Sequence, residues 1–198
     1  VLRACDNIQL YKLVCRQVAN SMGMTASFLP KPFVGINGSG MHTNISLSKN
    51  GKNIFYSKTG KDGLSDTAWN FVWKILNHAP EMCLTLNSSV NSYRRLDPHF
   101  EAPNQIKVSP IDRGSMIRIP VGNERSTRIE VRSVAPDSNP YLALYTIIRT
   151  GLEGKPLVKD KDKRDRVRVL PDNINDAIKL FKASDFMEKI LGKDNQDK

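Results

Sequence analysis

Arginine and glutamate alternate with apolar residues in one late segment of the chain, Arg128-Ile-Glu-Val-Arg132. Successive side chains of a strand point to opposite faces, so Arg128, Glu130 and Arg132 would share one face and the two apolar residues the other. Two interpretations stay open. The charged face is a solvated sheet surface with cross-strand ion pairs, each worth about 0.2–1 kcal/mol. Alternatively, it is a polyanion site, in which guanidinium groups hold phosphate oxygens and the carboxylate holds a metal ion.

A group of further arginines lies just upstream of this segment. They are Arg94, Arg95, Arg113, Arg118 and Arg125. Arginine is the better bidentate partner for carboxylate and phosphate. A nucleic-acid groove could use the same set, but aromatic residues make up only 7% of the chain and none alternates with these arginines, so the stacking surface of a single-strand site is thin. The arginines therefore favour small anionic ligands, and no nucleic-acid partner is predicted.

A glycine loop, Asn37-Gly-Ser-Gly-Met-His42, is the third candidate. Its glycines let the backbone approach a ligand closely or turn sharply. The loop is not a dinucleotide-binding fingerprint, because no third glycine follows at the required spacing. A single histidine is most often structural, yet His42 together with Glu130 would make a plausible nitrogen and oxygen pair for a metal ion.

The composition fits a globular chain with an anionic partner. The 198 residues are 39% hydrophobic and 25% charged, with a formal net charge of +10. This is room for one ordinary domain or two small ones. No apolar run approaches the roughly 18 residues that a membrane span needs, so no membrane contact is expected. Three cysteines without a CxxC pair, and no recognisable signal peptide, favour a reducing, cytoplasmic location. The chain opens on Val-Leu-Arg and is expected to be a piece of a longer protein.

Periodicity and capping residues predict the helices that must position these groups. One helix is expected from Asp6, as its cap, to near Gly23. Ile8, Tyr11, Val14 and Val18 recur in it at helical spacing. A second is expected from Ser65 or Asp66, kinked or restarted at Pro80, with Trp69 and Trp73 in the core. A buried apolar helix is expected over Tyr141–Thr150, begun by Asn139-Pro140 and closed by Gly151. A short helix is expected around Ile174–Leu191.

Strands are expected over residues 41–47, 54–56, 116–120 and 127–133, with Asn50-Gly51 as a tight hairpin turn between the first two. Residues 25–33 are strand-like but contain two prolines, and residues 87–113 are rich in turn formers. The mixed charge run of residues 155–168 is interpreted as a solvated linker. His78 and His99 are expected at the surface or in turns. Hairpin-paired strands with helices between them, without strict alternation, predict an α+β fold.

Four motifs in order resemble the C-terminal catalytic part of glutamine synthetases. They are Pro30-Lys-Pro32 with Asn37-Gly-Ser-Gly-Met-His42, Asn91-Ser-Tyr-Arg-Arg-Leu96 with Glu101-Ala-Pro103, Arg113 to Pro120, and Arg128-Ile-Glu-Val-Arg132 with Asn139-Pro-Tyr-Leu-Ala143. The resemblance is close over residues 5–154 and loose in the tail. It implies a curved, mostly antiparallel sheet with flanking helices. It also implies a catalytic core over residues 1–154, a charged linker and helical segment over 155–198, and an N-terminal β-grasp-like domain absent from this chain.

The resemblance assigns roles residue by residue. His42 and Glu130 would ligate a divalent metal, Mg²⁺ or Mn²⁺, that bridges the phosphates of ATP. Glutamate would be bound by Asn37, Gly38, Arg95 and Arg132. Arg113 would stabilise the transferring phosphoryl group. The remaining ATP contacts would come from Arg118 and Arg128, with Ser46 near the adenine. Glu101 would lie on a flap and help to deprotonate ammonium. Asn44 stands where bacterial members usually have a second histidine.

The implied reaction has two steps: ATP phosphorylates the glutamate side chain, and ammonia then displaces phosphate to give glutamine. Family sites form between subunits of a ring, so the resemblance also implies a homo-oligomer, dodecameric in form, and a chain that is inactive alone. Three alternatives remain open: γ-glutamyl transfer to a polyamine or another amine, a non-catalytic structural relative, and a basic nucleic-acid-binding module.

Overall fold

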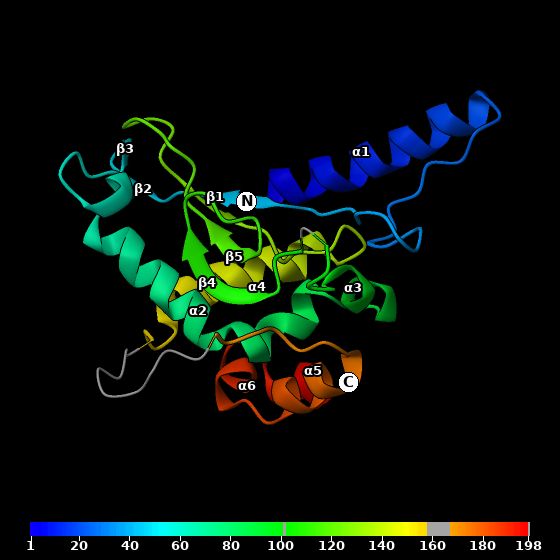
Figure 1. The fold of residues 1–198 in the computed structure, drawn as a ribbon. Coiled ribbons are helices and arrows are strands. Elements are labelled where there is room, and N and C mark those ends of the chain that lie inside the picture. Colours follow the sequence, from blue (N-terminus) through cyan, green and yellow to red (C-terminus); the bar gives the residue numbers. More distant parts are fainter. Residues whose placement is uncertain (101, 158–166, 198) are drawn as a thin grey trace.

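The computed structural model describes residues 1–100, 102–157 and 167–197, and within these ranges a sheet of four strands stands at the centre (Figure 1). The strands are β1 (Thr43–Ile45), β4 (Gln105–Ser109), β5 (Ser115–Arg118) and β6 (Ile129–Val131), in the order β1-β6-β5-β4. The pairs β1–β6 and β5–β6 are antiparallel, whereas β4–β5 is parallel. The predicted α+β class with a mostly antiparallel sheet is thereby confirmed.

The register of the sheet brings three polar residues abreast. Asn44 on β1 lies opposite Glu130 on β6, and Glu130 lies opposite Arg118 on β5. On the other face of β6, Ile129 and Val131 are fully buried in the core. The alternation predicted for residues 128–132 is therefore present, and it places the charged residues away from the core.

A short hairpin follows β1, formed by β2 (Ser48–Lys49) and β3 (Lys52–Asn53). Asn50 and Gly51 make its turn with φ of 51° and 75°, the left-handed values that a type I′ turn requires. The predicted turn is confirmed. The second strand lies at 52–53 rather than 54–56, because the chain turns inward there and buries Phe55 completely.

Two long helices pack against the sheet, and the first of them supplies a large share of the core. After a short 3₁₀ helix, η1 (Lys61–Gly63), helix α2 (Asp66–Leu86) begins where the Ser65 side chain accepts a hydrogen bond from the Ala68 N–H at 3.2 Å. Helix α2 continues past Pro80 without a break. Helix α4 (Pro140–Glu153) begins with Asn139 as its cap and runs past Gly151, which was predicted to end it. The two helices pack against each other and against the apolar face of the sheet.

The C-terminal segment completes this core. It contains α5 (Ile174–Lys182), α6 (Asp185–Leu191) and α7 (Lys193–Asp197). The single helix predicted over 174–191 is wrong, because α5 ends with Ala183 as its C-cap and Ser184 begins the next helix by accepting from the Met187 N–H at 3.1 Å. Phe181 and Met187 share the core with α2. Most of the predicted charged linker lies in residues 158–166, outside the described ranges, and the division at residue 154 stays a prediction.

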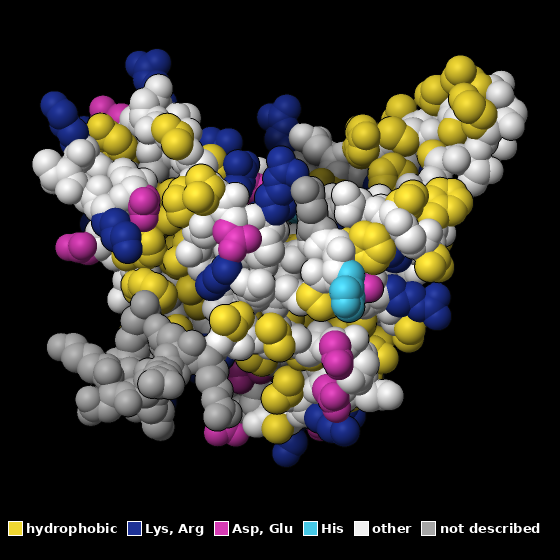
Figure 2. All heavy atoms as spheres, viewed as in Figure 1, with side chains coloured by type: hydrophobic (Ala, Val, Ile, Leu, Met, Phe, Trp, Pro, Cys, Tyr) yellow, Lys and Arg dark blue, Asp and Glu magenta, His cyan; other side chains and the backbone are white. Residues whose placement is uncertain are grey.

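Helix α1 (Leu2–Ser21) corrects one expectation, because it begins at Leu2 rather than after Asp6, which lies inside the helix. The apolar residues at helical spacing are not covered by the described residues: Tyr11, Val14 and Val18 are 63%, 49% and 51% exposed. The helix projects from the body of the molecule, and Figure 2 shows hydrophobic side chains gathered over it. Residues 25–33, which follow, have a strand-like sequence but form no strand, because their two prolines cannot donate ladder hydrogen bonds.

One region and one residue differ from what the sequence indicated. Residues 87–113, rich in turn formers, also contain regular structure, namely α3 (Val90–Arg95) and β4. His78, expected at the surface, is 8% exposed in α2, where it accepts a hydrogen bond from the Lys155 N–H at 2.9 Å and contacts Glu81. His99 is exposed, as predicted. No described helix is long and apolar enough to cross a membrane.

The contact between α2 and α4 predicts a stability effect at Gly151. A Cβ atom added there would lie 2.2 Å from ring carbons of Phe71, which is 2% exposed. Gly151→Ala should lower the free energy of unfolding by about 1–3 kcal/mol through overpacking, although the same change at an open helix position stabilises by about 1 kcal/mol. Urea unfolding followed by the fluorescence of Trp69 and Trp73 measures the effect. Leu152→Ala, at the half-exposed neighbouring position, is the control. An unfolding midpoint at or above the wild-type value would show that Phe71 moves aside without cost.

Candidate functional site

The carboxylate of Glu130 lies at the centre of the site. Glu130 is 5% exposed. Its Oε2 accepts a hydrogen bond from Arg118 Nε at 2.5 Å, and its Oε1 lies 2.9 Å from His42 Nδ1 and 3.7 Å from Arg132 Nε. Because a carboxylate only accepts, the Nδ1 of His42 is the protonated ring nitrogen in this arrangement. The structure thus brings together His42 and Glu130, which the sequence predicted as a metal-binding pair.

The glycine loop lies against this group. The loop is fixed at both ends by backbone hydrogen bonds, from Ser39 N to the Pro30 carbonyl at 2.8 Å and from Met41 N to the Val134 carbonyl at 2.9 Å. A Cβ atom on Gly40 would lie 2.6 Å from Arg95 Nη2 and 2.7 Å from His42 Nε2. A side chain there would have to displace Arg95 or His42. Gly40 is therefore required for the close approach of the loop to Arg95 and His42.

Two buried arginines form the floor of the site. Arg95, on α3, is 5% exposed and donates to the carbonyl oxygens of Arg132 at 2.9 Å and Ser133 at 3.4 Å. Arg132 is 8% exposed and donates from Nη1 to the carbonyl of Arg113. The two guanidinium groups are held by backbone atoms of neighbouring elements, so their positions are set by the fold before any ligand binds.

The electrostatics of the site favour an anion and a neutral imidazole. Burial, followed by the charge of Arg132, lowers the pKa of Arg95 to about 10. Arg95 therefore stays protonated at neutral pH. Burial and Arg132 also lower the pKa of His42, and the attraction of Glu130 only partly opposes them. An uncharged imidazole is the form that binds metal ions.

These groups surround a small cavity of about 180 Å³. It is lined by Asn37, Gly38, Gly40, His42, Arg95, Phe100, Ala102 and Arg132. The two buried guanidinium groups of the floor suit a carboxylate, because its two coplanar oxygens can accept two parallel hydrogen bonds from a guanidinium group. Four residues predicted to bind glutamate, Asn37, Gly38, Arg95 and Arg132, therefore line one cavity with the metal candidate His42.

The other predicted residues lie around this cavity rather than in it. Arg118 faces Glu130, and Arg128 donates to Asn44 Oδ1 at 2.9 Å. Ser46 is exposed just after β1, and the side chain of Arg113 is exposed in the turn between β4 and β5. The predicted catalytic residue Glu101 lies outside the described residues.

Lys31 lies in the first family-like motif, Pro30-Lys-Pro32, but the sequence predicted no role of its own for it. Lys31 is 9% exposed, and its Nζ lies 3.4 Å from the ring centre of Phe100, which lines the cavity. Its backbone exchanges two hydrogen bonds with the side chain of Asn91, at 2.7 Å and 3.0 Å. The burial of Lys31 could not be predicted, because a lysine between two prolines carries no pattern that indicates burial.

The donor set fits part of a divalent metal site. Among the residues that the structure describes, no group of three or more His, Cys, Asp or Glu side chains converges. His42 and Glu130 supply one nitrogen and one carboxylate, which suits Mg²⁺ or Mn²⁺ when other oxygens complete the shell. These two residues fit such an ion without forming a complete site.

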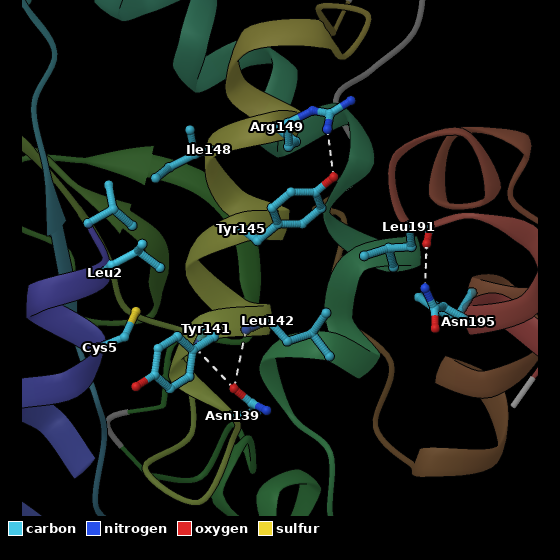
Figure 3. A pocket seen from close by; sticks show the side chains of 12 residues that line it. Leu2, Cys5, Asn139, Tyr141, Leu142, Tyr145, Ile148, Arg149, Leu191 and Asn195 are labelled. Atoms are coloured by element: carbon cyan, nitrogen blue, oxygen red, sulfur yellow. Dashed lines mark hydrogen bonds between the residues drawn. The ribbon is translucent and has the colours of Figure 1, made fainter. Parts of the chain in front are cut away.

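A larger cavity, of about 670 Å³, lies elsewhere, between α1, α4 and the C-terminal helices (Figure 3). Leu2, Cys5, Tyr141, Leu142 and Tyr145 point into it, and its lining is mainly apolar. None of the residues predicted to do chemistry lines it. Its size therefore does not make it the functional site.

Comparisons with known proteins agree with this geometry. The family model described as "Glutamine synthetase, catalytic domain" matches residues 1–198. The chain is 41% identical over 207 residues to the glutamine synthetase of Methanosarcina mazei, covering 97% of this chain and 46% of the relative. It is 38% identical over 206 residues to that of Clostridium saccharobutylicum, covering 96% and 46%. The chain thus spans about half the length of these relatives.

A solved structure shows the same fold. The cryo-EM structure of Plasmodium falciparum glutamine synthetase superposes with a TM-score of 0.89, at 24% identity, over 99% of this chain and 49% of that chain. Together with the family match over all 198 residues, this fold and the site within it show that the chain belongs to the glutamine synthetase catalytic domain family.

Proposed function

We propose that this chain is the catalytic part of an enzyme that joins ammonia to L-glutamate at the expense of ATP, giving glutamine, ADP and phosphate. The observation that carries the proposal is the contact between His42 and Glu130 beside the buried pair Arg95 and Arg132. A metal-ligating pair next to a carboxylate-binding floor is the arrangement that this reaction needs.

Glutamate is held by the cavity. Arg95 and Arg132 bind its carboxylate groups, and Asn37 and the backbone of Gly38 bind from the loop side. The guanidinium groups are already desolvated and oriented, so little ordering remains to be done when the substrate enters.

Catalysis proceeds in two steps, phosphoryl transfer to glutamate and displacement of phosphate by ammonia. A γ-carboxylate oxygen of glutamate attacks the γ-phosphorus of ATP, and the bond from that phosphorus to the bridging oxygen of ADP breaks. Ammonia then attacks the carbonyl carbon of the acyl phosphate, and inorganic phosphate leaves. Arg113 stabilises the negative charge that spreads over the transferring phosphoryl group. Arg118 and Arg128 contact the nucleotide phosphates, and Ser46 contacts the region of the adenine.

His42 and Glu130 would hold a divalent cation, Mg²⁺ or Mn²⁺, which when bound neutralises charge on the ATP phosphates. Glu101 takes the proton that ammonium must lose before its nitrogen can attack. These roles rest on the match of each residue to the motifs of the family.

The described residues supply only two donors to the cation, and the relatives are about twice as long. We infer that an N-terminal β-grasp-like domain and further carboxylate ligands complete the site in the full polypeptide, which acts in the cytoplasm. We infer further that the full polypeptide assembles into a ring of identical subunits, a dodecamer, with sites at the subunit contacts.

The test uses the complete polypeptide. ADP release is followed with Mg²⁺, ATP and glutamate, with and without ammonium, and again with putrescine or methylamine. Ammonium-dependent turnover supports the proposal. Turnover only with the larger amines would transfer the assignment to a γ-glutamyl-amine ligase, and no turnover with any acceptor in an assembled oligomer would leave a non-catalytic relative.

Removing the charge of Glu130 should abolish most of this activity. Glu130→Gln keeps the size of the side chain but removes a cation ligand and the partner of Arg118, and we expect kcat to fall by about 10²–10³-fold. Glu124→Gln, at an exposed glutamate in the loop before β6, is the matched control and should keep its activity. Unchanged turnover in Glu130→Gln, with the protein folded by circular dichroism, would overturn the assigned role of the carboxylate.

The glycine loop gives an independent prediction. Gly40→Ala should lower kcat/KM for glutamate by about 10–100-fold, because the added methyl group displaces Arg95 or His42 and small displacements at a catalytic site are costly. Ser39→Ala, next to it and exposed, should change the value less than twofold. Equal values in the two variants would show that the loop backbone moves to make room.

A further inference from the structure

Asp137 lies outside the cavity, in the connector between β6 and α4, and makes two hydrogen bonds that the proposed reaction does not use. Its Oδ2 accepts from Ser89 Oγ at 2.6 Å and its Oδ1 accepts from Ser92 Oγ at 3.1 Å. A carboxylate offers an acceptor to each hydroxyl, whereas an amide offers only one. The pairing is therefore matched to an ionised aspartate.

The two serines form the beginning of α3. Ser89 is the N-cap, and its Oγ accepts from the Ser92 N–H at 3.2 Å. Ser92 is fully buried, and Arg95 follows it by three residues. Residues three apart share a face of a helix, so the face of α3 that contacts Asp137 is also the face that presents Arg95.

The connector between β6 and α4 also contacts Arg95, at the C-terminal end of this face of α3. Arg95 donates to the carbonyl oxygens of Arg132 and Ser133, at the start of the connector. Asp137, at its far end, holds the first turn of α3. Since Arg132 lines the cavity beside Arg95, contacts at both ends of the connector fix the two guanidinium groups relative to each other.

The negative charge of Asp137 also helps to hold Arg95 in place. Burial and the repulsion of Arg132 lower the pKa of Arg95, while the attraction of Asp137 opposes them. Asp137 also attracts Lys12 of α1, which donates to the Pro136 carbonyl at 2.5 Å. A negative group on this side of α3 therefore offsets repulsion that would push Arg95 away from the cavity.

We propose that Asp137 is a positioning residue that, through Ser89 and Ser92, sets α3 so that Arg95 meets the substrate carboxylate. The inference rests on the proposed function, because it takes glutamate as the ligand of Arg95. Asp137 touches no reacting atom, so its loss affects the binding of glutamate and leaves the binding of ATP unchanged.

The experiment compares Asp137→Asn with Asp176→Asn in the complete polypeptide. Asp176 loses the same charge from an exposed position on α5. We expect Asp137→Asn to raise the KM for glutamate about tenfold, as for loss of one charge-assisted hydrogen bond, with the KM for ATP within twofold of wild type. Hydrogen exchange at the amides of residues 92–96 should also become faster by about tenfold, as local opening of α3 becomes easier. Asp176→Asn should change neither quantity.

Several outcomes separate the two proposals. If the wild type turns over glutamate and Asp137→Asn matches Asp176→Asn in KM, the positioning role is overturned. If KM for ATP rises equally, the effect is general and the role is again overturned. If the wild type shows no glutamate-dependent turnover, the proposed function fails, and exchange at α3 alone decides whether Asp137 holds the helix. Should Asp137→Asn fail to fold, Ser92→Ala replaces it, with an expected rise in KM of about fivefold, and exposed Ser88→Ala is its control.

Discussion

The rest of the site is arranged around one buried negative charge. Moving a carboxylate out of water costs several kcal/mol even after the protein relaxes, and the cost is offset only when opposite charges and hydrogen bonds surround it. Glu130 meets this requirement through Arg118 at 2.5 Å and His42 at 2.9 Å. Arg118 is placed by the β5–β6 register, and His42 by the chain entering β1. The pairing of three short strands is thus also what assembles the chemistry.

The arginines of the cavity depend on a different part of the fold. Arg95 is carried by a helix of six residues, which is far too short to be stable by itself in water. Its position comes from contacts with the connector after β6 and, through Asn91, with the segment that carries Lys31. The same helix therefore links the sheet to the loop before the glycines. This explains how a small element can present a buried cation in a fixed orientation, although burial and the charge of Arg132 lower its pKa.

The features that could be predicted from the sequence are those set by a residue and its nearest neighbours in the chain. The alternation around Glu130, the caps Ser65 and Asn139, and the Asn50-Gly51 turn are local signals, and the structure confirms each of them. Helix α3 was missed because its stability is tertiary, and the position of His78 because its partner is the distant Lys155. The meeting of His42 with Glu130, far apart in the chain, was expected from the resemblance and could not follow from spacing alone.

The open face of α1 combines a local signal that holds with a surface that the described residues leave uncovered. The helical spacing of Tyr11, Val14 and Val18 predicted a helix, and the helix forms, yet these side chains are exposed. Exposed apolar surface costs roughly 25 cal/mol per Å² relative to burial, and contiguous patches of this kind mark contact surfaces. The proposed cation site shows a parallel deficit, because the described residues supply two donors where a divalent cation takes about six. Both features fit the proposal that the full polypeptide contains a further domain, since the chain spans about half the length of its relatives. Under that proposal, the apolar residues of α1 serve a contact with another part of the assembled protein.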